Sequence, residues 1–141
     1  MTFTNSEEWK EPEIKERELT KYHWLVLHKE NLKLGKYTDI GAFTLLDASE
    51  GIEIEEGVKI GSHTSIYSRT DSDKKKGKVI LKNGCAIGSH CVIMPGITIG
   101  ENALVGAMSF VNKDIPASEV WVGSPARFLK KRGEIQEKEG V

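Results

Sequence analysis

Residues 85–114 read CAIGSH-CVIMPG-ITIGEN-ALVGAM-SFVNKD, five successive six-residue units with the same internal pattern. The third place of each unit is aliphatic and the first place is mostly small, as Ile87, Ile93, Ile99, Val105 and Val111 follow Cys85, Cys91, Ile97, Ala103 and Ser109. A period of six fits neither the 3.6-residue turn of an α-helix nor a strand alternation that ends in varied turns. Self-similarity at a fixed period is the sequence signature of a solenoid. The stretch therefore predicts a repetitive coil.

The six-residue unit also predicts the shape of that coil. A strand of about four residues and a two-residue corner form one flat face, and three faces close a triangular turn of about eighteen residues. The third-place aliphatic residue points inward and stacks on its equivalent in the next turn. The first-place residue is interior too, and must be small enough for a narrow prism. The expected fold class is therefore all-β, a parallel β-helix.

The rhythm extends towards the N-terminus with one slip. Aliphatic residues stand six apart at Leu34, Ile40, Leu46 and Ile52, and after a shift of two near Gly51 they continue at Ile54, Ile60 and Ile66. The next aliphatic residue in phase, Leu81, lies fifteen positions after Ile66. Read as twelve plus three, this spacing predicts a three-residue insertion in a protruding loop at residues 68–78, where function tends to collect.

Three segments are expected. Residues 1–31, rich in Glu and Lys, predict an N-terminal arm or a short helix. Residues 32–125 predict the β-helix. Residues 126–141, charged with a few apolar anchors, predict a short C-terminal helix.

The composition excludes several classes of function. Lys and Arg number 20 against 21 Asp and Glu, so no nucleic-acid partner is indicated. The apolar run at residues 24–27 is too short for membrane insertion and lacks a signal-peptide layout, which favours a cytoplasmic protein.

The two cysteines, Cys85 and Cys91, occupy the same place in adjacent units. They should enter the interior from different faces, where disulfide geometry is poor. Two thiols alone do not make a metal site, so no metal is expected. Both are predicted to be small buried residues.

The run IGSHCVIMPGITIGENALVGAMSFVNKDIP, residues 87–116, followed by WVGSPARFLKK, residues 121–131, resembles the hexapeptide-repeat acyltransferases. That family has a left-handed parallel β-helix and includes sugar O-acetyltransferases and N-acyltransferases of nucleotide-linked amino sugars. The resemblance covers residues 34–131. The repeat is shared by proteins with other activities, whereas the Asp-Ile-Pro and Val-Gly-Ser-Pro-Ala-Arg ending is more specific to acyltransferases.

The resemblance implies a homotrimer with active sites between neighbouring β-helices and acetyl-CoA as acyl donor. Carried over by position, Ser89, Gly106, Ala107 and Lys113 would line the cofactor arm. Gly123, Ser124, Pro125 and Arg127 would shape its nucleotide end, with Lys130 and Lys131 available to phosphates. Alternatively, the basic residues from Arg127 to Arg132 form a solvated tail.

Many members of the family place a histidine after an Ile-Tyr pair at the start of the loop, as the general base. Here Arg69 holds that place, in Ile66-Tyr67-Ser68-Arg69. A guanidinium stays protonated and cannot act as a base. One explanation is an amine acceptor that needs no strong base, with Arg69 binding a nucleotide-sugar phosphate.

A second explanation is another base, and a third is loss of catalysis. His63 is ranked above His90, and Asp71 and Asp73 in the loop remain candidates. His23 and His28, outside the expected repeat, are predicted to be surface or packing residues. Asp47 either holds the acceptor or bonds a corner N–H, and Tyr67 and Asp71 join Arg69 as candidate acceptor contacts.

The function expected is transfer of acetyl from acetyl-CoA to the amine of a nucleotide-linked amino sugar, in surface-polysaccharide (lipopolysaccharide) biosynthesis. The alternatives are sugar O-acetylation and a non-catalytic trimeric β-helix that acts as a binding or scaffold protein.

Overall fold

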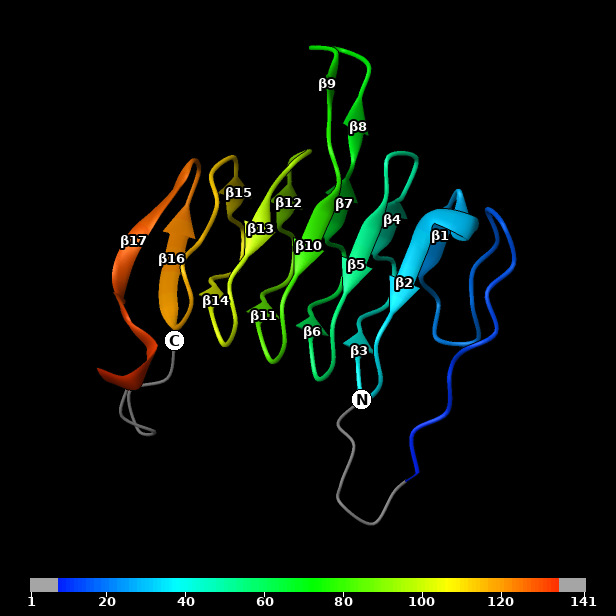
Figure 1. Cartoon of the computed structure of the whole chain (residues 1–141), viewed down its shortest axis with the longest axis horizontal. Helices are drawn as coiled ribbons and strands as arrows, with labels where there is room; N and C mark the ends of the chain where they lie inside the picture. The colour runs from blue at the N-terminus through cyan, green and yellow to red at the C-terminus, as the bar shows by residue number, and fades with distance from the viewer. Residues whose placement is uncertain (1–7, 135–141) are drawn as a thin grey trace.

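The computed structural model describes residues 8–134, which form a β-solenoid (Figure 1). Its three sheets, parallel except at the C-terminal end, form the three faces of the coil. Face A contains β1 (Leu25–Leu27), β4 (Leu45–Asp47), β7 (Ser65–Tyr67), β12 (Val92–Ile93) and β15 (Phe110–Val111). Face B contains β2 (Leu32–Leu34), β5 (Ile52–Ile54), β10 (Val79–Leu81) and β13 (Thr98–Ile99). Face C contains β3 (Asp39–Ile40), β6 (Lys59–Ile60), β11 (Ala86–Ile87), β14 (Leu104–Val105), β16 (Glu119–Gly123) and β17 (Ala126–Lys131). The predicted fold class, a left-handed parallel β-helix, is confirmed.

The aliphatic third places form the core. Leu46 pairs with Ile66 in the next turn, and Ile66 pairs with Ile93. All three side chains are fully buried. The prism is thus filled by columns of branched side chains, one column for each face.

The small residues at the first places are buried, and several of their side chains donate hydrogen bonds to carbonyl oxygens of the neighbouring turn. The Thr44 and Thr64 hydroxyls donate to the carbonyl oxygens of Gly61 and Gly88 at 3.2 and 3.0 Å. The Cys91 thiol donates to the Gly106 carbonyl at 3.2 Å. Cys85 and Cys91 are free and buried, as predicted.

The slip near Gly51 is a wide corner rather than a lost strand. Leu25 pairs with Leu45, twenty positions later, whereas Val92 pairs with Phe110, eighteen positions later. The two extra residues of the early turns lie in the corners at 28–31 and 48–51, the first of which holds the short 3₁₀ helix η1 (Lys29–Asn31).

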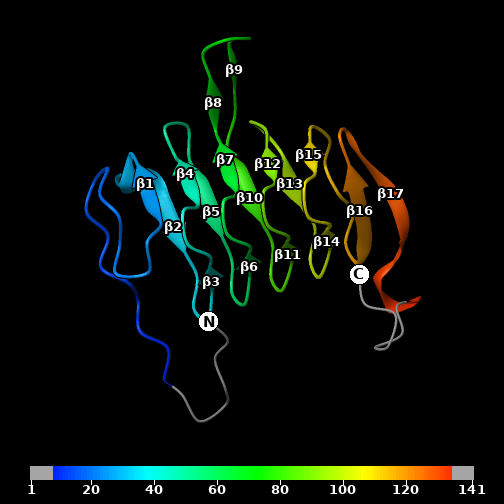
Figure 2. The ribbon, with the colours of Figure 1, turned by 180° about the vertical axis from the view of Figure 1, so that it is seen from behind.

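The loop at residues 68–78 protrudes as predicted, but its expected size is wrong. Ile66 in β7 and Leu81 in β10 lie on consecutive faces of one turn, so the fifteen-residue spacing is one six-residue step with nine residues inserted. The insertion forms a hairpin of β8 (Arg69–Thr70) and β9 (Lys75–Lys76) that stands clear of the coil (Figure 2). The segment SRTDSDKKKGK offers no aliphatic residue to the core, and therefore forms no face of its own.

The C-terminal helix expected over residues 126–141 is wrong for the described part. Residues 126–131 form β17, antiparallel to β16, and only Arg132–Glu134 form a 3₁₀ turn, η2. Pairing with β16 satisfies backbone groups at the end of face C, which an isolated charged helix could not do. Residues 135–141 lie outside the described residues.

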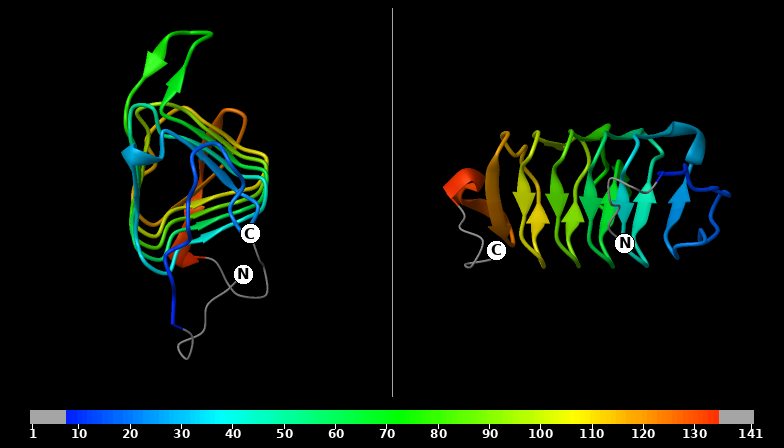
Figure 3. Two further views of the ribbon diagram at one scale, coloured as in Figure 1. Left: turned by 90° about the vertical axis from the view of Figure 1, so that its right-hand side faces the viewer. Right: turned by 90° about the horizontal axis from the view of Figure 1, so that it is seen from below.

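The N-terminal arm, residues 8–24, contains no helix or strand and crosses the open end of the triangular coil (Figure 3). Ile14 packs against the core, and the Glu16 carboxylate accepts the N–H groups of His28 and Lys29 at 2.7 and 2.8 Å. The coil also starts earlier than the expected residue 32, because β1 already pairs with β4.

Candidate functional site

The corner between faces C and A, here called corner CA, repeats one local sequence four times. It reads Ile-Gly-Ala-Phe at 40–43, Ile-Gly-Ser-His at 60–63 and 87–90, and Val-Gly-Ala-Met at 105–108. The glycine lets successive turns approach closely, since a Cβ on Gly61 would lie 2.4 Å from the backbone nitrogen of Ser89. The fourth residue of each unit has φ near +60°. The side chains of these residues therefore stand at one edge of the prism.

The rings of His23, Phe43, His63 and His90 stack along this corner. We call them, together with Met108 at the same place in the next turn, the corner ladder. The ring centroids of His23 and Phe43 lie 6.3 Å apart, those of Phe43 and His63 5.3 Å, and those of His63 and His90 4.7 Å. Phe43 is 56% exposed and Met108 69% exposed, so the ladder faces outward. His23, near the end of the N-terminal arm, is exposed and continues the stack through its ring contact with Phe43.

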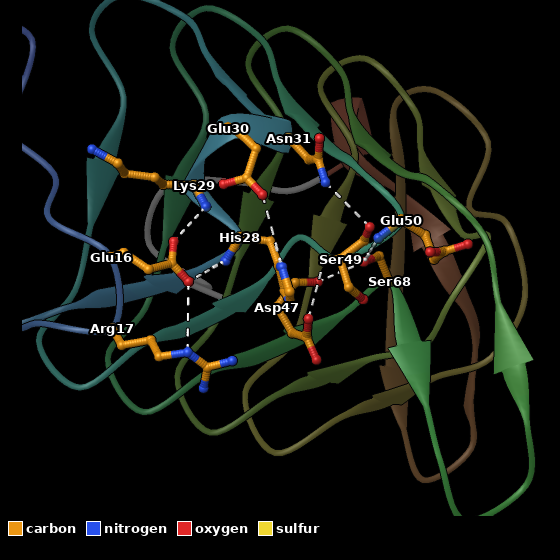
Figure 4. A network of polar contacts seen from close by, with 10 residues as sticks. All are labelled: Glu16, Arg17, His28, Lys29, Glu30, Asn31, Asp47, Ser49, Glu50 and Ser68. Carbon is orange, nitrogen blue, oxygen red and sulfur yellow. Dashed lines mark hydrogen bonds and ion pairs between the residues drawn. The ribbon is translucent and has the colours of Figure 1, made fainter.

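The opposite edge of face A, corner AB, holds the other candidates. Asp47 and Tyr67 pair in register at the ends of β4 and β7. The Asp47 carboxylate accepts the N–H of Ser49 at 3.2 Å, a bond within the corner (Figure 4). The Ser68 hydroxyl donates to the Asp47 carbonyl at 2.6 Å, and anchors the start of the hairpin.

Arg69 points into the exposed hairpin. Its Nε lies 3.2 Å from Asp71 Oδ1, and both side chains are more than half exposed. Such a pair adds little stability, so Arg69 remains available to an anionic ligand. Asp73 accepts the Thr70 hydroxyl, and this hydrogen bond holds the pKa of the Asp73 carboxyl below its usual range.

Within one chain, the ladder histidines at corner CA and the candidate residues at corner AB lie apart. His63 precedes β7 and Tyr67 ends it, so four residues of extended chain, roughly 10 Å or more, separate the two corners. The ladder histidines therefore lie at one edge of face A, while Asp47 and Arg69 lie at the other.

The expected cofactor residues also divide between the corners. Ser89, Gly106 and Ala107 lie on corner CA, directly before His90 and Met108. The turn at Gly123 is tied to that corner, because its N–H donates to the Ser109 hydroxyl at 3.0 Å. Lys113 follows β15 and lies on corner AB instead.

The basic residues of β17 differ in the partners that they already have within the chain. The Arg127 guanidinium donates to the neighbouring Ala126 carbonyl, and Lys130 pairs in register with Val120. Lys131 forms an ion pair with Glu119 at 2.8 Å. Pro125 is exposed in the turn before β17.

Sequence reasoning missed the outer side of face A. Its outward residues are largely apolar and only partly buried: Leu25, Leu27, Leu45, Tyr67, Val92, Met94 and Phe110. The sequence does contain a sign of this apolar surface, because an apolar residue precedes the third-place residue in most of the units that form face A. The sign could not be interpreted from sequence alone, since the wide corners and the hairpin determine which units share a face.

Within residues 8–134, no cluster of His, Cys, Asp and Glu could hold a metal ion. The same part of the chain has no helix of the length and hydropathy that a membrane crossing requires.

Comparison with known proteins defines the family. Residues 78–113 match the bacterial transferase hexapeptide (six repeats). The provisionally named acetyltransferase YvoF of Bacillus subtilis is 30% identical over 120 residues, which cover 82% of this chain and 70% of YvoF. A provisionally named acetyltransferase of Staphylococcus aureus (strain Mu50) is 31% identical over 121 residues, 79% of this chain. This chain spans 58% of the length of that relative.

Solved structures agree with this family. An acetyltransferase of Vibrio cholerae in complex with acetyl-CoA is 26% identical with a TM-score of 0.72, over 77% of this chain and 64% of that one. AntD, an N-acyltransferase from Bacillus cereus in complex with dTDP and 3-hydroxybutyryl-CoA, is 29% identical with a TM-score of 0.70, over 80% and 78%. A maltose O-acetyltransferase from Clostridium difficile is 30% identical with a TM-score of 0.72, over 82% and 65%. The chain belongs to the hexapeptide-repeat acyltransferase family.

Proposed function

We propose that the protein transfers an acetyl group from acetyl-CoA to the amine of a nucleotide-linked amino sugar, at a step of cytoplasmic surface-polysaccharide assembly. The observation that carries this proposal is corner CA, where two stacked histidines continue a stripe of small residues. The family and the CoA complexes of similar proteins support an acyl-CoA donor.

The acyl donor lies along the stripe formed by Ser89, Gly106 and Ala107. Small side chains there let an extended pantetheine approach the backbone closely, and corner N–H and C=O groups can bond its amides. The turn at Gly123 and Pro125, with Arg127 and Lys130 on the strand that follows, supports the nucleotide end of the donor.

His63 accepts the proton that the acceptor amine loses. The acceptor nitrogen attacks the thioester carbonyl, the C–S bond breaks, an amide forms, and the proton lost by the amine passes through the imidazole to the departing thiolate. His63 is preferred to His90 because rings on both sides, Phe43 and His90, fix the position of its imidazole. Among the described residues, the His90 ring contacts one other ring, that of His63.

A second copy of the chain completes the site in this proposal. The apolar outer side of face A has the composition of a subunit contact, and its two edges carry the two halves of the candidate site. In a homotrimer packed through face A, corner AB of one subunit meets corner CA of the next. Arg69, Asp71 and Tyr67 then face the acceptor beside the neighbouring subunit's ladder, with Asp47 and Lys113 at the same edge.

One alternative acceptor is favoured by a specific observation. A hydroxyl needs a base more than an amine does, and the ladder supplies two imidazoles at the donor stripe. Sugar O-acetylation is therefore the second candidate. A non-catalytic scaffold would need neither the histidines nor the stripe.

Calorimetry with acetyl-CoA tests where the donor binds. Ala107→Trp fills the stripe with a bulky ring, and we expect acetyl-CoA affinity to fall at least tenfold. Ala117→Trp is the matched control, because Ala117 is exposed at an equivalent place on the corner between faces B and C. Equal affinity in the two variants, or no binding by the unmodified protein, would contradict the proposal.

A further inference from the structure

A cavity of about 300 Å³ lies between the N-terminal arm and the first turn of the coil. It is lined from the coil by residues 38–42, and from the arm by Trp9, Lys10, Pro12, Lys21, Tyr22, His23 and Trp24. We call it the arm pocket. Its volume is at the lower end of the range for ligand sites, so it suits one ring system rather than a whole nucleotide sugar.

The arm pocket has aromatic walls in fixed positions. The Trp9 indole N–H donates to the Thr38 carbonyl at 3.3 Å, and its ring lies 6.4 Å from the Tyr37 ring at 52°. Trp24 is 2% exposed at the base of the first turn. Glu16 fixes the arm further along through the N–H groups of His28 and Lys29 (Figure 4). The Trp9 ring, held in place this way in the pocket lining, offers a flat surface on which a heterocycle can stack.

The polar groups of the pocket match the rest of a nucleotide. Lys10 and Lys21 are exposed in the pocket lining, and Lys21 Nζ lies 5.7 Å from the centroid of the Tyr22 ring. Ammonium groups there can face phosphate oxygens.

The arm pocket lies at one end of the corner ladder. His23 lines the pocket and is also the first ring of the ladder. The ring centroids of His23 and Phe43 lie 6.3 Å apart, and those of Phe43 and His63 lie 5.3 Å apart, so the stack runs from the pocket to His63. A ribose with two phosphates is long enough to cover that distance along the exposed edge.

We propose that the arm pocket binds the heterocyclic base of a nucleotide-linked acceptor. Lys10 and Lys21 face its diphosphate, and its sugar extends along the ladder to His63. The inference rests on the proposed function for the role of the sugar, but binding of the nucleotide needs neither the acyl donor nor turnover.

The test is a titration of the full chain with dTDP and with UDP, followed by tryptophan fluorescence and by calorimetry, without acetyl-CoA. We expect saturable quenching, and an affinity at least tenfold weaker in Trp9→Leu and in Lys21→Ala. Trp121→Phe is the matched control at the far end of the coil, and should keep both the quenching and the affinity. Inorganic pyrophosphate should bind at least tenfold more weakly than dTDP if the base occupies the pocket.

Three results would overturn the inference: no saturable binding of either nucleotide, pyrophosphate binding as tight as dTDP, or binding that Trp9→Leu and Lys21→Ala leave unchanged while circular dichroism shows both folded. Acetyl transfer to a sugar without a nucleotide, together with no nucleotide binding, would leave the transferase standing and remove the arm pocket from it. Conversely, nucleotide binding that depends on Trp9 in a protein without turnover would support the pocket and contradict the proposed function.

Discussion

The imidazole rings of His63 and His90 stack at 4.7 Å, with their planes 7° apart. They are 27 residues apart in sequence, but the Ile-Gly-Ser-His units at 60–63 and 87–90 occupy the same corner of successive turns. The nine extra residues of the hairpin leave the coil through another corner, so they do not disturb the stack. The coil spacing thus sets the distance between the two candidate bases.

Replacing His63 by Ala should lower kcat by roughly a hundredfold or more, the usual contribution of a general base. The KM for acetyl-CoA should change less than about threefold, because the proposed position of the donor is on the stripe rather than on the ring. Steady-state thiol release measures both constants. His90→Ala is the control, with an expected loss of less than about tenfold, and a larger loss for His90→Ala would reverse the assignment.

Replacing Arg69 by Ala should raise the KM for a nucleotide-linked acceptor by about tenfold with little change in kcat, since the guanidinium binds an anion and moves no proton. Arg69→Lys should recover part of the affinity, because it keeps the charge without the planar donor set. Asp71→Ala serves as the control for the exposed ion pair, with an expected stability change below about 0.5 kcal/mol. A fall in kcat alone for Arg69→Ala would contradict an anchoring role.

Gly61→Ala should destabilise the coil by about 2 kcal/mol or more, because its Cβ would lie 2.4 Å from a backbone nitrogen of the next turn. Urea unfolding measures the change in free energy. Gly133→Ala is the matched control, since no atom lies within 4 Å of the added carbon. Similar midpoints for the two variants would show that the turns are not in close contact at corner CA.

Neither thiol should react with iodoacetamide in the folded protein at pH 8. Burial raises the pKa of Cys85 to about 12, and burial also raises the pKa of Cys91. At pH 8 a thiol with that Cys85 pKa is a thiolate in roughly one molecule in ten thousand. Mass spectrometry should find both cysteines unmodified until denaturant is added. Rapid labelling of either cysteine in native protein would contradict the buried positions.

Acidification should release the N-terminal arm. The N–H groups of Lys29 and His28 hold the pKa of the Glu16 carboxyl below its usual range. A lowered folded pKa gives stability that is complete above the unfolded pKa and lost as the pH falls through the folded one. Trp9 emission should therefore shift below about pH 4.5, and Glu16→Gln should lack this transition. An identical acid transition in the variant would assign it to another group.

The periodic part of the chain was predictable from sequence because one six-residue pattern fixes strand, corner and core together. The inward positions of Ile66 and Ile93 and the buried state of the cysteines follow from it. The segments outside the period were not predictable in this way. Residues 126–131 became a strand because β16 offered them a partner, and the arm forms a pocket only through its packing on the first turn.

The candidate site was predicted residue by residue, but not as an arrangement. The sequence names His63 as a candidate base and Asp47 as a candidate acceptor contact, but the coil places the two residues at opposite edges of face A. Their separation depends on which six-residue units share a face. Counting the units along the sequence does not reveal this, because the wide corners and the nine-residue insertion change the number of residues per turn. The ladder neighbours Phe43 and Met108 were missed because an exposed apolar corner residue has no periodic signal of its own.

Acetyl-CoA-dependent thiol release, measured with a panel of dTDP- and UDP-linked amino sugars and with maltose as a hydroxyl acceptor, decides whether the protein acetylates a nucleotide-linked amine. We expect turnover with a nucleotide-linked amino sugar, and a loss of roughly a hundredfold or more in His63→Ala. No turnover with any amine or hydroxyl acceptor, together with no acetyl-CoA binding by calorimetry, would contradict the proposed function.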